Sequence, residues 1–167
     1  SQVTLPHMAE SAGVKVETEL SQAEARELLK VFAAHRAWSA RALAPIMEPP
    51  TAANLRVILF SDQARYLAAT SDFAHSLGSN GGFYDGAANT VYSFREGNSL
   101  GLLLHELSHA MMGEAFEDRV FERYRRSGWP VWLDEGVAEV LAAATLRREG
   151  RGFSLRAEPA VKLGALV

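Results

Sequence analysis

The stretch 103–111 reads Leu-Leu-His-Glu-Leu-Ser-His-Ala-Met, with its polar residues at helical spacing inside an apolar run. In a helix, His105 and His109 lie one turn apart, so both imidazoles can reach one metal ion. Glu106 stands beside that position, where a general base would take a proton from water activated by the metal. The apolar residues fall opposite the histidines and predict a face buried in the core: Leu103, Leu104, Leu107, Ala110 and Met111. At this point a metal-free helical domain with a chance match to the motif stays open.

A catalytic zinc site needs a further ligand, because such sites take three protein ligands and keep one position for water. The metzincin class of metallopeptidases would require a glycine at 112 and a histidine at 115. The chain has Met112 and Ala115 instead, which excludes that class. Further along, residues 129–139 read Trp-Pro-Val-Trp-Leu-Asp-Glu-Gly-Val-Ala-Glu, with carboxylates four residues apart. Such spacing alone is also typical of a solvated acidic helix face.

Residues 105–109 and 129–139 together resemble the gluzincins, the thermolysin-like and aminopeptidase-like zinc metallopeptidases. In that family a W-L-x-E-G-x-A-E stretch forms a glutamate helix that supplies the third ligand. The chain resembles in particular the small peptidase-MA-like domains of this family. The resemblance implies that Glu135 completes a site for one Zn²⁺ ion with the two histidines of the motif.

The resemblance also assigns roles to the neighbours of Glu135. It implies that Asp134 and Glu139 hydrogen-bond the second nitrogens of the zinc histidines, which would fix the tautomer and strengthen each imidazole as a ligand. Gly136 lies one step round the helix from Glu135. We expect its missing side chain to allow a close approach between the glutamate helix and the helix that carries His105.

Apolar and alternating patterns predict an α+β fold. The expected elements, in order, are a strand over 14–20, a long helix over 21–44, a strand over 54–60, a short helix over 61–69, strands over 82–85 and 90–94, and a helix from about 99. Ser21 and Glu24 form a capping-box pattern that opens the long helix. We expect the elements after the 105–109 helix to be helical.

This layout is similar to the upper subdomain of zincin-like folds, a small mixed sheet packed on a long N-terminal helix and the HExxH helix, followed by the glutamate helix. Residues 1–13 are expected to be a flexible leader, and 14–167 a single gluzincin-like domain, which is either truncated at its C-terminus or a minimal form of the fold. In the family, a sheet edge beside the zinc cleft binds extended substrate by main-chain pairing. We expect either 90–94 or 82–85 to be that edge.

Composition fits a small domain with a core of its own, since 48% of the 167 residues are hydrophobic and 22% are charged. The net charge of −3 gives no indication of nucleic acid or an anionic membrane as a partner, and no apolar run is long enough to span a bilayer. The chain has no cysteine, so neither disulfides nor cysteine ligands are expected. The compartment, extracytoplasmic or cytoplasmic, and the oligomeric state stay open.

The expected function is zinc-dependent hydrolysis of peptide bonds in a peptide or protein substrate, with Glu106 as general base. Gluzincins stabilise the oxyanion with a tyrosine or histidine well after the third ligand, but 136–167 contains neither. Three tyrosines remain as candidates for that role: Tyr84, Tyr92 and Tyr124. The activity could therefore be weak or latent, and the alternative is a non-catalytic zinc-binding module with a binding or regulatory role. His35 has no metal spacing to another residue and is expected to be a surface or packed histidine.

Overall fold

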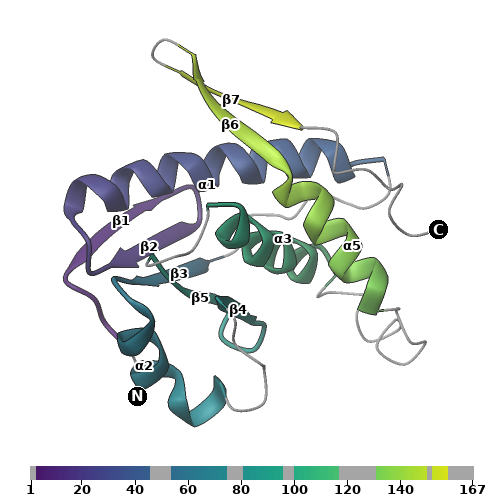
Figure 1. Cartoon of the computed structure of the whole chain (residues 1–167). Coiled ribbons are helices and arrows are strands. Elements are labelled where there is room, and N and C mark those ends of the chain that lie inside the picture. The colour runs from purple at the N-terminus through teal and green to yellow at the C-terminus, as the bar shows by residue number, and fades with distance from the viewer. Residues whose placement is uncertain are drawn as a thin grey trace.

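The computed structural model describes residues 3–45, 54–74, 81–95, 100–116, 131–149 and 152–157. The strands are β1 (His7–Ser11), β2 (Val14–Thr18), β3 (Leu55–Phe60), β4 (Gly82–Asp85), β5 (Thr90–Phe94), β6 (Ala144–Glu149) and β7 (Gly152–Ala157). The helices are α1 (Gln22–Leu43), α2 (Gln63–Ala74), α3 (Leu100–Phe116) and α5 (Val131–Ala142). The predicted α+β class is confirmed. The long helix α1 packs on a five-stranded mixed sheet, and α3 contacts both this sheet and the helix α5 (Figure 1).

Helix α1 begins where the capping-box pattern predicts. Ser21 has extended backbone angles, φ −161° and ψ 162°, and its Oγ accepts a hydrogen bond from the backbone N–H of Glu24 at 3.1 Å. This bond satisfies a donor that the first helical turn leaves free. Buried residues recur every three or four positions along the helix: Ala25, Leu28, Phe32, His35, Ser39 and Leu43. One stripe of α1 therefore faces the sheet and α3.

The sheet has the strand order β1-β2-β3-β5-β4. Strands β2, β3 and β5 are parallel, and β1 and β4 are antiparallel to their neighbours. The strand predicted over 54–60 is β3, which lies at the centre of the sheet. Val16, Val57 and Val91 stand in register across the parallel strands and are fully buried. They share one core with Leu104 of α3, so the sheet fixes where α3 lies.

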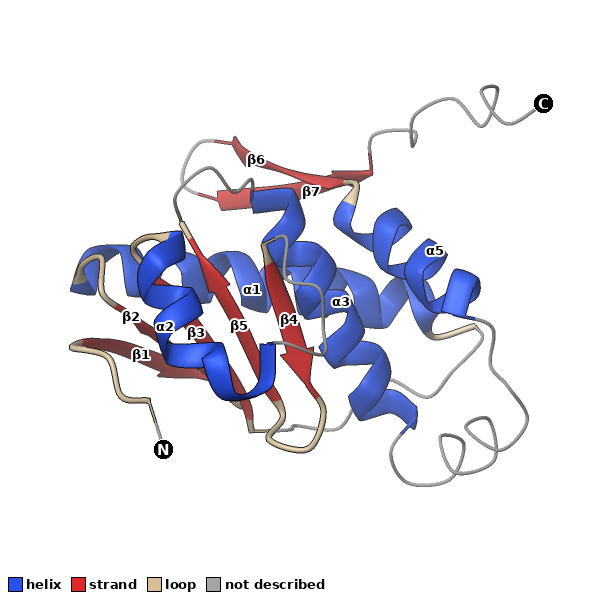
Figure 2. Cartoon of the chain, turned by 60° about the horizontal axis from the view of Figure 1, so that its bottom comes forward, coloured by secondary structure: helices blue, strands red, loops and turns tan. Residues whose placement is uncertain are grey.

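The other face of the sheet is covered by α2 (Figure 2). Asp62 caps this helix, because its Oδ1 accepts from the backbone N–H of Arg65 at 2.9 Å. The helix continues beyond the predicted end at residue 69. Tyr66 is fully buried in an aromatic core on this face, where Phe83 and Tyr92 stack at 5.0 Å between ring centroids. The two faces of the sheet thus carry separate apolar cores.

Polar residues on the central strands are paired within the sheet. Arg56 of β3 donates two hydrogen bonds of 2.8 Å to the carboxylate of Glu17 on β2, and Lys15 lies 2.9 Å from the same carboxylate. Burial alone would raise the pKa of Glu17, but the hydrogen bonds and charges of Arg56 and Lys15 outweigh it and lower that pKa to about 2. Glu17 is therefore ionised at neutral pH although it is only 1% exposed.

The prediction of a flexible leader over 1–13 is wrong for His7–Ser11, which forms β1 and pairs antiparallel with β2. Its signal in the sequence is weak because Ala9 is the one buried residue of the strand. The connecting residues Ala12 and Gly13 have positive φ values of 49° and 76°. Two positive φ values suit a tight two-residue hairpin, but such turns favour asparagine or glycine at the position that alanine holds here.

The prediction of purely helical elements after α3 is also wrong. Strands β6 and β7 form an antiparallel hairpin in which Leu146 pairs with Leu155 and Glu149 with Gly152. This hairpin lies over α1 (Figure 1). Gly150 and Gly152 provide a turn signal between two short strands, a pattern typical of a hairpin.

Strand β4 is an edge of the sheet, and it contacts α3. Of the two segments predicted to be an edge, 82–85 is therefore the one that lies at an edge of the sheet. The alternative 90–94 is wrong, because β5 pairs with β3 on one side and β4 on the other. Strand order depends on pairings between distant segments, which local patterns do not specify. Among the described residues, no helix has the length and apolar character needed to cross a membrane.

Candidate metal centre

Helix α3 presents its two histidines on the side away from the core. The five apolar residues predicted to be buried are all at most 6% exposed: Leu103, Leu104, Leu107, Ala110 and Met111. The opposite side carries His105 and His109, whose side chains are 13% and 15% exposed. Packing of the leucine face against the sheet therefore aims both imidazoles at α5.

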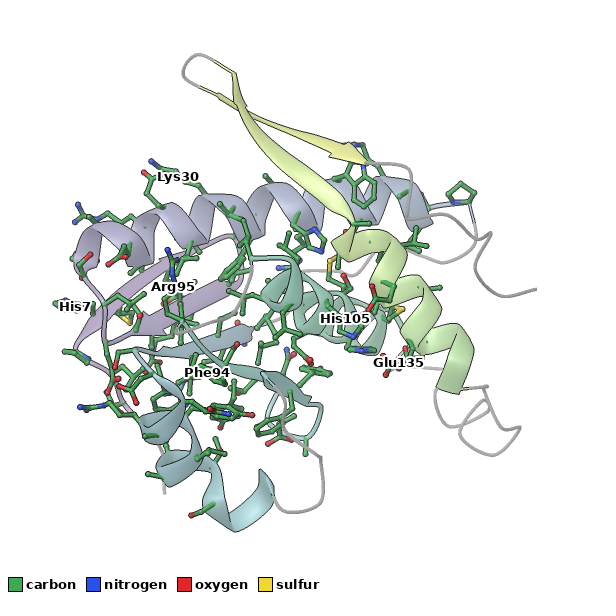
Figure 3. The ribbon with its side chains drawn as sticks, in the orientation of Figure 1. His7, Lys30, Phe94, Arg95, His105 and Glu135 are labelled. Carbon is green, nitrogen blue, oxygen red and sulfur yellow. The ribbon has the colours of Figure 1, made fainter. Side chains whose placement is uncertain are left out.

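Glu135 of α5 meets these histidines across the gap between the two helices (Figure 3). Its carboxylate oxygens lie 3.3 Å from His105 Nε2 and 3.6 Å from His109 Nε2, and the two Nε2 atoms are 3.1 Å apart. One ligand atom from each of the three residues lies within 4.8 Å of the other two. His105, His109 and Glu135 could therefore hold a metal ion, as the sequence predicted.

The second nitrogens of both imidazoles face carboxylates of α5. Asp134 Oδ2 lies 3.2 Å from His109 Nδ1, and Glu139 Oε1 lies 3.5 Å from His105 Nδ1. A proton on each Nδ1 would be donated to these carboxylates, which leaves both Nε2 lone pairs directed at the shared position. The arrangement of the four nitrogens thus suits metal ligation through Nε2 on both rings.

The site also alters the acidity of its own groups. Burial lowers the pKa of His109, but the hydrogen bond and charge of Asp134 outweigh burial, so the pKa is raised. Burial raises the pKa of Glu106, and the neighbouring imidazoles oppose that rise without cancelling it. A carboxylate whose pKa is moved toward neutrality can exchange protons more readily near pH 7.

Glu106 does not join the ligand cluster but lines the same cleft, which has a volume of about 770 Å³. The lining combines carboxylates and an imidazole with small or apolar residues, and it comprises Gly101, Leu102, His105, Glu106, Glu135, Glu139, Ala142 and Ala143. The apolar part of this lining was not predicted, because no motif marks it. It depends on the packing of the start of α3 beside the end of α5.

The prediction that Gly136 permits close helix packing is wrong. Gly136 is exposed, and a Cβ placed on it would meet no atom within 4 Å. Among the α5 side chains that the structure describes, Ala138 and Leu141 are buried, at 0% and 3% exposure. The face that approaches α3 follows from Asp134 through Ala138 to Leu141, at spacings of four and three residues, whereas Gly136 lies on the outward side.

Of the three tyrosines predicted as candidates for oxyanion stabilisation, the two that the structure describes are not brought into the cleft. Tyr92 lies on the α2 side of the sheet, stacked on Phe83, and the hydroxyl of Tyr84 donates to Asn89 Oδ1 at 3.1 Å. Neither lines the cleft that contains Glu106. Tyr124 lies outside the described residues, as do the two tryptophan side chains that precede Asp134.

Comparison with known proteins adds no assignment. No protein-family model matches the sequence, and no curated protein is significantly similar to it. The geometry of the site is therefore the basis for assigning a function to this chain.

Proposed function

We propose that this chain is a zinc-dependent metallopeptidase of the gluzincin type. The observation that carries the proposal is the convergence of His105 Nε2, His109 Nε2 and the Glu135 carboxylate, while both Nδ1 atoms face carboxylates. Two nitrogens on a tetrahedral zinc, each at 2.0–2.1 Å, would be about 3.3 Å apart. The Nε2–Nε2 separation of 3.1 Å is close to that value. Two imidazoles and one carboxylate are a donor set that zinc accepts with one position left for water.

The ligands, Glu106 and the two outer carboxylates each have a defined task under this proposal. A zinc ion held by His105, His109 and Glu135 would supply a Lewis acid that lowers the pKa of water to about 7 and polarises a carbonyl. Glu106 accepts the proton of the attacking water and passes it to the leaving amine. Asp134 and Glu139 orient the two imidazoles.

Strand β4 supports a peptide as the substrate. Its outer edge is free of a neighbouring strand in the described part of the sheet, and it packs beside α3. An extended peptide that paired with this edge would lie along the helix that carries Glu106. Main-chain pairing of this kind binds many sequences, because the hydrogen bonds come from the peptide backbone.

A second candidate function is a non-catalytic zinc-binding module. It is favoured by one observation: no tyrosine among the described residues lines the cleft. An oxyanion donor contributes roughly 3–4 kcal/mol to the stabilisation of the transition state in enzymes that use one. Without it, a metal site would persist but hydrolysis would be slow.

To test the proposal, the full chain is incubated with casein or with a mixed peptide library, and the cleavage products are identified by mass spectrometry. We expect new cleavage products from the zinc-loaded protein, loss of those products after treatment with a zinc chelator, and recovery when zinc is returned. Metal content is measured on the same samples. Cleavage that survives complete zinc removal, or a protein that takes up no zinc, would contradict the proposal.

Removing the carboxylates behind the histidines should weaken zinc binding unequally. Outer carboxylates of this kind typically change metal affinity by about 10–100-fold. We expect Asp134→Ala to have the larger effect, because Asp134 lies at 3.2 Å with 41% of its side chain exposed, whereas Glu139 lies at 3.5 Å with 77% exposed. Competition titration with a chromophoric chelator measures both variants. Equal affinity in wild type and Asp134→Ala would contradict the assigned role.

A further inference from the structure

A buried polar contact joins α1 to the helix that carries the metal histidines. His35 of α1 is fully buried, and its Nε2 lies 3.2 Å from Oγ of Ser108, which is also fully buried. Ser108 belongs to the 105–109 motif. His35 is thus the packed histidine that the sequence allowed, but its partner lies 73 positions along the chain and has no signal in the sequence.

The direction of this hydrogen bond follows from the second bond that Ser108 makes. Ser108 Oγ donates its single hydrogen to the backbone carbonyl of Leu104 at 2.8 Å. Oγ can then only accept from the ring, so His35 Nε2 carries the proton and donates it. Burial lowers the pKa of His35 to about 4, which keeps the ring neutral at pH 7. Nδ1 of this ring has no hydrogen-bond partner among the described residues.

The contact lies directly behind the metal site. Leu104 and Ser108 each precede one of the metal histidines by one residue, and the Ser108–Leu104 bond spans the same helical turn as the two imidazoles. A rotation or axial shift of α3 that broke the contact would displace both Nε2 atoms together. Metal sites require their ligands to be held within about 0.5 Å of the productive geometry.

Stability alone does not account for a polar pair at this place. Its surroundings are an apolar core that includes Phe32 of α1 and Leu104 and Leu107 of α3. Burying hydrogen-bonding groups in such a core is at best neutral compared with apolar residues of similar size. Hydrogen bonds do, however, select one alignment of two helices where apolar contacts tolerate several.

We propose that His35 is a positioning residue for the metal site: its Nε2–H holds Ser108 and thereby fixes the turn of α3 that carries His105 and His109. This inference rests on the proposed metal centre and concerns its geometry rather than the hydrolytic step.

The test compares H35L with H35Q in the full chain. The leucine removes the donor and fills the space, whereas the glutamine side chain retains an N–H near the position of Nε2. We expect H35L to fold, to bind zinc roughly tenfold or more weakly, and to show a changed visible absorption spectrum when loaded with cobalt in place of zinc. H35Q should restore most of the affinity and the wild-type cobalt spectrum.

Ser39→Ala is the matched control, because Ser39 is a fully buried hydroxyl on the same face of α1 with no hydrogen-bond partner among the described residues. It should leave both metal readouts unchanged. S108A removes the acceptor and provides a second variant if H35L does not fold; it should reproduce the changed cobalt spectrum.

The inference is overturned if H35L, or S108A in its place, keeps the zinc affinity and cobalt spectrum of the wild type. It is also overturned if H35Q is as impaired as H35L, since the hydrogen bond would then not be the cause. Wild-type protein that binds neither metal would overturn the metal centre itself, which separates failure of the proposed function from failure of this inference.

Discussion

Glu106→Gln should leave zinc bound and reduce peptide hydrolysis by about 10²–10⁴-fold, the usual contribution of a general base. Glutamine has the same shape as glutamate but cannot take a proton from water at neutral pH. Because Glu106 lies outside the ligand cluster, its replacement should not change the zinc stoichiometry. The measurement is kcat/KM on a peptide that the wild type cleaves, together with the zinc content of the same sample.

Glu10→Gln is a matched control for this substitution, because Glu10 is an exposed residue of β1. It should retain full activity. Unchanged activity in Glu106→Gln would remove Glu106 from the mechanism. If wild type and Glu106→Gln are equally inert on every substrate while both bind zinc, the non-catalytic zinc module becomes the better account of the chain.

His109→Ala should remove tight zinc binding. It takes away one of the three converging ligand atoms and also leaves Asp134 without the ring nitrogen that it faces. Since the loss of an outer carboxylate already weakens binding by about 10–100-fold, we expect the loss of a ligand to exceed that range. Competition titration gives the affinity, and circular dichroism shows whether the fold persists.

His7→Ala provides the control for His109→Ala. His7 is on β1, and Figure 3 shows it at the far end of the molecule from His105. We expect the His7→Ala variant to bind zinc with the same affinity as the wild type. Tight stoichiometric zinc in His109→Ala would refute the ligand set.

Local signals were sufficient for the elements that hold the site. The Ser21 and Glu24 pattern marks the start of α1, the apolar run at 55–60 marks the central strand, and the spacing within 103–111 separates a buried face from a metal-facing one. Each depends on neighbours within a few positions, which is the range over which capping and periodicity act.

Features that depend on distant contacts were predicted incompletely or not at all. The sequence left 82–85 and 90–94 as alternative edges, since only the pairing of β5 with β3 decides between them. Strand β1 was missed because it owes its place to pairing with β2. The sequence predicts that Gly136 contacts the helix that carries His105, but a Cβ placed on Gly136 would meet no atom within 4 Å. Ala138 of α5 is fully buried instead.

The candidate site shows the same division. Spacing alone predicted that His105 and His109 share a face, but Glu135 required a resemblance to a known family before it could be chosen. The approach of Glu135 to the two histidines depends on the packing of α5 against α3. No local sequence pattern predicts the contact between His35 and Ser108, because a single histidine on an apolar helix face is compatible with many partners.

The division of the ligands between two helices has a consequence for the chain as a polymer. His109 is the last of the ligand residues on α3, and Glu135 is the ligand residue on α5. An ion bound to both would therefore close the intervening chain into a loop. Covalent cross-links that close loops of a few tens of residues restrict the unfolded chain by about 3–4 kcal/mol. A bound ion would act as a reversible cross-link of this kind and tether α5, the outermost helix of the site, to the layer that packs on the sheet.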